Sequence, residues 1–67
     1  MLNMEAIRVS HGQWPWMRYE YGDVGTIYGL RSGYEYAGKR FVSLETAERE
    51  MWNDYVRRAQ VHVGKES

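Results

Sequence analysis

Aromatic side chains are concentrated in one part of this 67-residue chain. Ten residues are aromatic, and seven of them lie within residues 14–36: Trp14, Trp16, Tyr19, Tyr21, Tyr28, Tyr34 and Tyr36. A domain of this size buries only about 60% of the surface that its unfolded chain exposes, so it cannot bury every ring. We therefore expect some of these rings at the surface, where Trp, Tyr and Arg most often carry binding energy.

The composition narrows the classes of protein to consider. The chain has no cysteine, so neither a disulfide nor a thiolate metal site stabilises it, and we expect an intracellular (cytoplasmic) protein. Nine basic residues balance nine acidic ones, whereas a dedicated nucleic-acid-binding domain usually has a basic surplus. No apolar run is long enough to span a bilayer, and the first residues do not resemble a signal peptide. A neutral chain with exposed rings tends to self-associate, so a homodimer is one alternative.

Alternating apolar and polar residues predict a short antiparallel sheet. Strands are expected at about residues 5–10, 14–21, 24–31 and 39–42, with turns near 11–13 and 22–25. Pro15 cannot donate a ladder hydrogen bond and is expected at a strand start or an edge, and Gly29 suggests a bulge or a close approach by a backbone or ring. The segment 34–36 fits either a strand or an ordered loop, so three to four strands are expected.

One helix is expected at about residues 44–60, followed by a frayed tail over 64–67. Ser43 is a favourable N-cap, and Val42 is placed to pack against Ala47 as a hydrophobic staple. An apolar stripe at helical spacing follows, formed by Leu44, Ala47, Met51, Tyr55 and Ala59. The fold class is therefore α+β: a small antiparallel sheet packed on one face by a single C-terminal helix.

A single helix covers one face of a sheet and leaves the other open. Within residues 14–21, alternation gives a set with two charges (Trp14, Trp16, Arg18, Glu20) and a set without any (Met17, Tyr19, Tyr21). We assign the charged set to the open face and the uncharged set to the core. The candidate partner-binding residues are Trp14, Trp16, Arg18, Tyr28, Arg31, Tyr34 and Tyr36.

Each candidate has a structural alternative. The two tryptophans beside Arg18 are typical of an interface hot spot, but they also fit rings packed over the sheet edge with the guanidinium stacked on one of them. The tyrosines beside Arg31 fit a stacking platform for single-stranded nucleic acid, but tyrosine is also a common strand residue. Zero net charge favours the structural role for the tyrosines.

Catalytic and metal-binding patterns are not evident. Glu48 lies within the apolar stripe of the helix, where it is either a general acid or a structural partner of a tyrosine hydroxyl or an arginine. His11 and His62 are not at a metal-ligand spacing, and the glycines match no phosphate-binding pattern. We expect neither an enzyme, nor a cofactor, nor a metal site.

Residues 38–43 followed by 44–49, a Gly-Lys-containing last strand leading into a helix that opens with Glu-Thr-Ala-Glu, resemble part of a known architecture. The whole order of strand, turn, strand, turn and then this stretch is similar to the three-strand-plus-helix domains of plant AP2-type factors and to the arm-binding domains of some phage and transposon integrases. This resemblance covers somewhat over half of the chain and implies a sheet that contacts DNA through Arg, Lys and Trp. Trp14, Trp16, Arg18 and Arg31 match those residue types, whereas Glu20, Asp23 and Glu35 depart from them and would repel phosphate.

The leading hypothesis is a non-enzymatic protein-interaction module that docks on another protein through an aromatic sheet face. In kind, the chain is similar to the small accessory and inhibitor proteins of phages and mobile elements. The alternative is a sheet-based DNA-binding accessory domain, which zero net charge disfavours. The third is a homodimer that buries its rings against a second copy.

Overall fold

The computed structural model describes residues 3–66, with side-chain surroundings up to Gln60. Its sheet is a five-stranded antiparallel meander in the order β1-β2-β3-β4-β5. The predicted α+β class is confirmed, but the sheet has five strands because residues 34–36, left undecided by the sequence, pair on both sides as part of β4. The strands are β1 (Val9–Gln13), β2 (Trp16–Glu20), β3 (Thr26–Leu30), β4 (Gly33–Tyr36) and β5 (Lys39–Phe41).

The first predicted strand is displaced along the chain. Met4–Ile7 forms a short helix, α1, and Asn3 caps it by accepting a hydrogen bond from the Glu5 amide at 3.1 Å. Met4 is buried and Ile7 packs against the core. Such a three-residue step suits a helical turn, whereas alternation would place the two on opposite faces of a strand. The predicted turn at residues 11–13 is the second half of β1, so the chain reverses at Trp14 and Pro15 instead.

The C-terminal helix α2 (Leu44–Glu66) starts where the sequence predicts but extends further than residue 60. The Ser43 hydroxyl accepts a hydrogen bond from the Thr46 amide at 3.2 Å, as expected of an N-cap. The predicted staple is wrong, because Val42 is 93% exposed while Ala47 is buried. Of the predicted frayed tail, residues 64–66 continue α2, and residue 67 lies outside the described residues.

The core lies between the first half of α2 and one end of the sheet. Its buried residues are Met4, Tyr21, Val24, Ile27, Ala47 and Met51. Tyr21 belongs to this core as predicted, and Tyr19 packs against it half-buried. The Tyr19 ring lies only 3.1 Å from where a Cβ on Gly29 would be, which is the close approach that a glycine inside a strand suggested.

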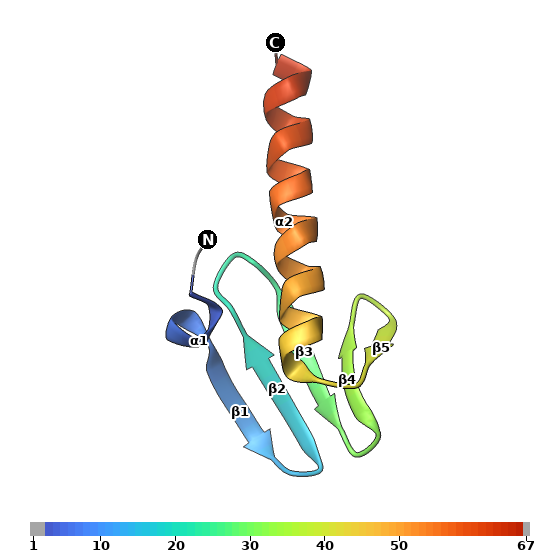
Figure 1. The fold of residues 1–67 in the computed structure, drawn as a ribbon. Coiled ribbons are helices and arrows are strands. Elements are labelled where there is room, and N and C mark those ends of the chain that lie inside the picture. Colours follow the sequence, from blue (N-terminus) through green and yellow to red (C-terminus); the bar gives the residue numbers. More distant parts are fainter. Residues whose placement is uncertain (1–2, 67) are drawn as a thin grey trace.

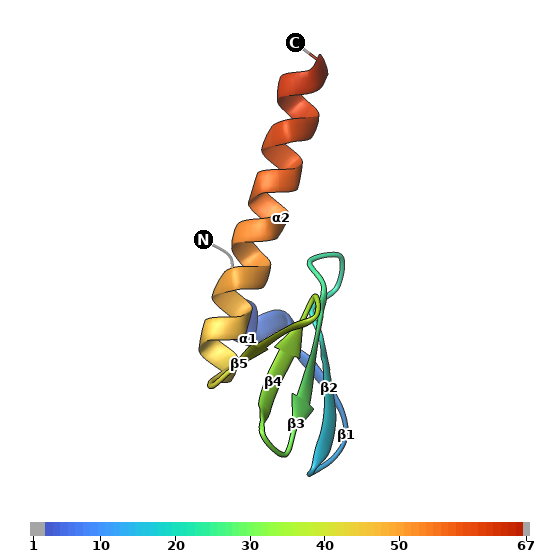
Figure 2. The same cartoon turned by 90° about the vertical axis from the view of Figure 1, so that its right-hand side faces the viewer.

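Helix α2 packs on β3, β4 and β5 and leaves the opposite face of the sheet open (Figures 1 and 2). Only the first part of α2 lies over the sheet, and the rest projects beyond it, giving a molecule of 45 × 22 × 16 Å. At the other end, the helix-bearing face extends past the start of α2 (Figure 1). Within residues 3–66, neither helix is long and apolar enough to cross a membrane.

Candidate interaction site

The strand register defines what the open face displays. Directly paired residues of an antiparallel sheet point to the same side, and one such row crosses all five strands: His11, Arg18, Tyr28, Glu35 and Arg40. Trp16 and Glu20 lie two residues from Arg18 along β2 and share its face. Trp16, Arg18 and Glu20 therefore lie on the open face, as predicted.

The open face combines exposed rings with balanced charges. Trp16 is 71% exposed and Tyr28 is 48% exposed. The Arg18 Nε lies 3.1 Å from one carboxylate oxygen of Glu20, and the His11 Nε2 lies 3.1 Å from the other. Glu35 on β4 and Arg40 on β5 are opposite each other in the strand register and lie on this same face. This face is therefore amphipathic without a surplus of either charge.

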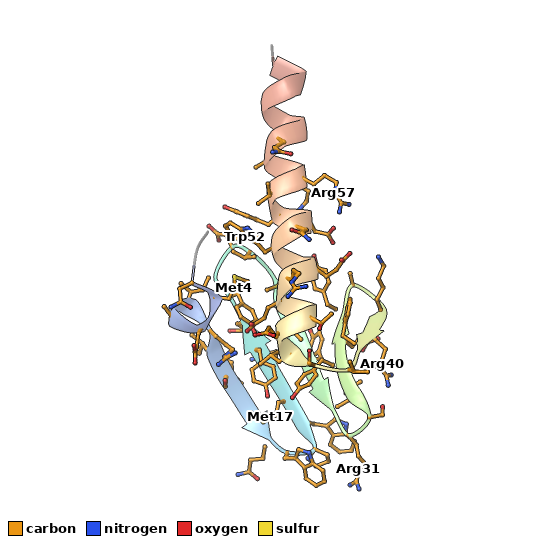
Figure 3. The ribbon with its side chains drawn as sticks, viewed as in Figure 1. Met4, Met17, Arg31, Arg40, Trp52 and Arg57 are labelled. Atoms are coloured by element: carbon orange, nitrogen blue, oxygen red, sulfur yellow. The ribbon has the colours of Figure 1, made fainter. Side chains whose placement is uncertain are left out.

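A groove of about 360 Å³ lies on the helix-bearing face. Its lining residues are Trp14, Pro15, Met17, Tyr19, Gly29, Leu30, Arg31, Ser32, Gly33, Tyr34 and Val42. The Tyr19 and Tyr34 rings lie 6.2 Å apart between centroids and are tilted by 50°. Figure 3 shows Met17 on this part of the sheet and Arg31 at the end furthest from α2. The groove is therefore the part of this face that α2 does not cover.

Trp14 and Arg31 form one side of the groove. The Arg31 guanidinium carbon lies 5.1 Å from the centroid of the Trp14 ring, a cation–π distance. The Trp14 ring is still 71% exposed. Within the described part of the chain, no carboxylate forms an ion pair with Arg31. The groove thus carries an exposed indole and a cation available to an anionic partner.

The structure distributes the predicted partner-binding residues over three places: the open face, the groove, and the contact between the sheet and α2. The prediction that Trp14 shares a face with Trp16 is wrong, because Trp14 precedes β2 and lines the groove on the other side of the sheet. Tyr34 also lines the groove. Tyr36 points to α2, where its hydroxyl donates to Asp54 at 3.0 Å, and burial raises its pKa. Tyr36 is therefore a packing residue.

Glu48 joins three parts of the fold. Its Oε2 accepts a hydrogen bond from the Tyr21 hydroxyl at 2.5 Å and from the Arg8 Nη1 at 2.8 Å. Burial, followed by the hydrogen bond to Glu48, raises the pKa of Tyr21. A second hollow, of about 470 Å³, lies beside Glu48 between α1 and α2, and Trp52 lines it. Because one carboxylate oxygen already serves two donors, we assign Glu48 a structural role.

Sequence reasoning missed several groove residues, notably Met17 and Val42. Alternation placed Met17 toward the helix, and this position stays uncovered because α2 reaches over only part of the sheet (Figure 3). Val42 is exposed because β5 turns into α2 at this point, and no local pattern signals it. Of the two histidines, His11 lies on the open face, and the side chain of His62 lies outside the described residues.

The described residues contain no group of three or more His, Cys, Asp or Glu side chains placed to hold a metal ion. In comparisons with family models, with curated proteins and with solved structures, no match to this chain was found.

Proposed function

We propose that this protein is a non-enzymatic interaction module that binds an extended segment of another protein in the groove beside Trp14. The observation that carries the proposal is the Trp14 ring, 71% exposed at the edge of the groove and stacked on Arg31. Large, rigid rings beside an arginine are the residues that most often dominate protein interfaces. Such a role fits the accessory and inhibitor proteins to which the chain is similar in kind.

The chemistry of the groove indicates the kind of segment that it binds. Met17 and the rings of Tyr19 and Tyr34 supply the apolar part of its lining, which favours an apolar or aromatic anchor on the partner. Arg31 supplies a guanidinium without a carboxylate partner among the described residues. Arginine recognises carboxylates through two parallel hydrogen bonds. The preferred ligand is therefore an extended peptide with an apolar anchor next to an acidic residue.

The charges of the open face argue against the DNA-binding alternative. Arg18 already contacts Glu20, and Arg40 lies next to Glu35 across the strands. A sheet that binds DNA must supply net positive charge to the phosphates, and this face supplies none. We therefore place recognition of another protein first.

Selection of peptides from a random library against the purified protein tests the proposal. Recovered peptides should share an apolar or aromatic residue beside Asp or Glu, and Trp14→Ala should weaken their binding at least tenfold, the effect of removing a hot-spot ring. Arg31→Glu should remove the preference for acidic residues. Trp16→Ala is the matched control, because Trp16 is equally exposed but lies on the other face.

Three outcomes would contradict the proposal. The first is a selection that recovers no binding peptide. The second is equal loss of binding in Trp14→Ala and Trp16→Ala, which would place the ligand elsewhere. The third is tight binding of a DNA duplex at low salt that weakens steeply as salt rises, which would favour the alternative. Circular dichroism spectra of each variant show whether the fold is retained.

A further inference from the structure

The open face has a charge pattern that is complementary to itself. We propose that this face packs against the same face of a second copy of the chain, about a two-fold axis parallel to β3. The proposal is independent of the groove, which lies on the other side of the sheet. The resulting dimer would carry its two grooves on its outer surfaces.

The meander makes β3 the central strand of five. A two-fold rotation about the direction of β3 therefore places β3 over the partner's β3. The same rotation places β2 over the partner's β4, and β1 over the partner's β5. Two sheets stacked in this way are nearly aligned and about 10 Å apart. The cross-strand register then fixes which side chains oppose each other near the axis.

The two charges next to the axis in the central row are complementary under this rotation. Arg18 on β2 and Glu35 on β4 flank Tyr28 on β3 at the same level. Each Arg18 then opposes the partner's Glu35, so one contact occurs twice, as a two-fold interface requires. Arg18 uses its Nε for Glu20 and keeps its Nη atoms for a second carboxylate. Among residues 3–60, no cation forms an ion pair with Glu35.

The next row along the strands places a tryptophan opposite a glycine. Met17 pairs with Gly29 and Leu30 pairs with Gly33, so Trp16 lies level with Gly33. The rotation places the exposed Trp16 ring over the partner's Gly33, beside the partner's Arg40, whose Cδ lies 3.5 Å from where a Gly33 Cβ would be. In the central row, Tyr28 meets the partner's Tyr28 at the axis. Rings in such offset or tilted contacts stabilise interfaces beyond their buried area.

The other two-fold axis in the plane of the interface runs across the strands and gives a poorer match. It would place β2 over the partner's β2, and the central row would oppose Arg18 to the partner's Arg18. Like charges opposed at an interface are unfavourable. The charge pattern therefore selects the axis along β3.

The size of the sheet sets the strength of this dimer. Five strands of this length cover an area of about 20 Å by 17 Å. Such a face is at the small end of specific interfaces, in the class of weak and reversible complexes. We therefore expect dissociation in the micromolar range, so that the dimer is seen as association that rises with concentration.

Reversing the charges separately on two variants gives a sharp test. In R18E, residues 18 and 35 are both acidic, and in E35R both are basic, so each variant repels its own copy. An equimolar mixture of the two variants opposes unlike charges at both contacts. By sedimentation velocity from about 10 to about 500 µM, the wild type should associate reversibly. Each single variant should stay monomeric, and the mixture should associate again.

R57E and E45R are the matched controls, because they change the net charge by the same amounts on α2, away from the open face. Both should associate as the wild type does, and so should W14A, whose altered residue lines the groove. The proposal is overturned if the wild type is monomeric at every concentration. It is also overturned if the single variants associate normally, or if their mixture stays monomeric.

Discussion

Replacing Glu48 by alanine tests how this small domain is held together. Glu48 is the only described residue that joins α2 to both Arg8 and Tyr21 through side-chain hydrogen bonds. Its side chain is 13% exposed, whereas the Arg8 side chain is 25% exposed. The Tyr21 hydroxyl belongs to a fully buried residue and donates its hydrogen bond to Glu48.

The expected cost follows from these contacts. A buried hydroxyl left without a partner costs about 1–3 kcal/mol. Loss of the partly exposed pair with Arg8 adds about 0–1 kcal/mol, so Glu48→Ala should lower the free energy of unfolding by about 1–4 kcal/mol. The core of a domain this small rarely supplies more than about 3–5 kcal/mol. The variant should therefore lose a substantial share of its stability.

Urea unfolding followed by tryptophan fluorescence and by circular dichroism measures this loss. Tyr21→Phe removes only the hydroxyl and should cost about 1 kcal/mol. The double variant should be less destabilised than the sum of the two single variants by about 1–2 kcal/mol, because the shared hydrogen bond is lost only once. A cost for Glu48→Ala below about 0.5 kcal/mol, the range of an ordinary surface substitution, would refute this reasoning. Additive costs would refute it as well.

Three further measurements test other parts of the fold. The folded state raises the pKa of Tyr21, so the neutral Tyr21 hydroxyl stabilises the fold fully below the ordinary tyrosine pKa of 10.0, and this stabilisation is lost as the pH rises through the raised pKa. Tyr21→Phe should therefore flatten the decline of the urea midpoint above the ordinary pKa. Gly12 has φ of 94°, and a Cβ there would lie 2.6 Å from the Trp16 carbonyl oxygen, so Gly12→Ala should lower the thermal midpoint, with a loss of more than about 1 kcal/mol. Val42→Ser should change stability by less than about 0.5 kcal/mol. A loss above about 1 kcal/mol would instead show that Val42 packs as a hydrophobic staple after all.

Local chemistry alone was sufficient for some elements. The start of α2 follows from Ser43, because an N-cap side chain acts on the amide three residues further along. The β2–β3 hairpin follows from alternation on both sides of a glycine-containing turn. Gly29 marked a close ring contact because an interior glycine in a strand suggests one. Each of these signals is short in range, and each was confirmed.

Errors arose where distant contacts outweigh local pattern. Residues 4–7 alternate weakly, but the buried position of Met4 beneath α2 and the cap from Asn3 make them helical. Val42 fits a staple by sequence, yet the path from β5 into α2 turns it to solvent. The segment 34–36 became a strand only because both β3 and β5 were present to pair with it.

For the aromatic residues, the sequence by itself determined that a chain of this length must leave rings exposed, and that Tyr21 belongs to the core. Only the tertiary structure decided which rings share a surface. Trp14 and Trp16 are two residues apart, and simple alternation joins them, but the chain reverses at Trp14 and Pro15 and sends the rings to opposite sides of the sheet. The tertiary structure also decided how much of the sheet α2 covers, because this depends on where α2 crosses the sheet, and no local pattern encodes that position.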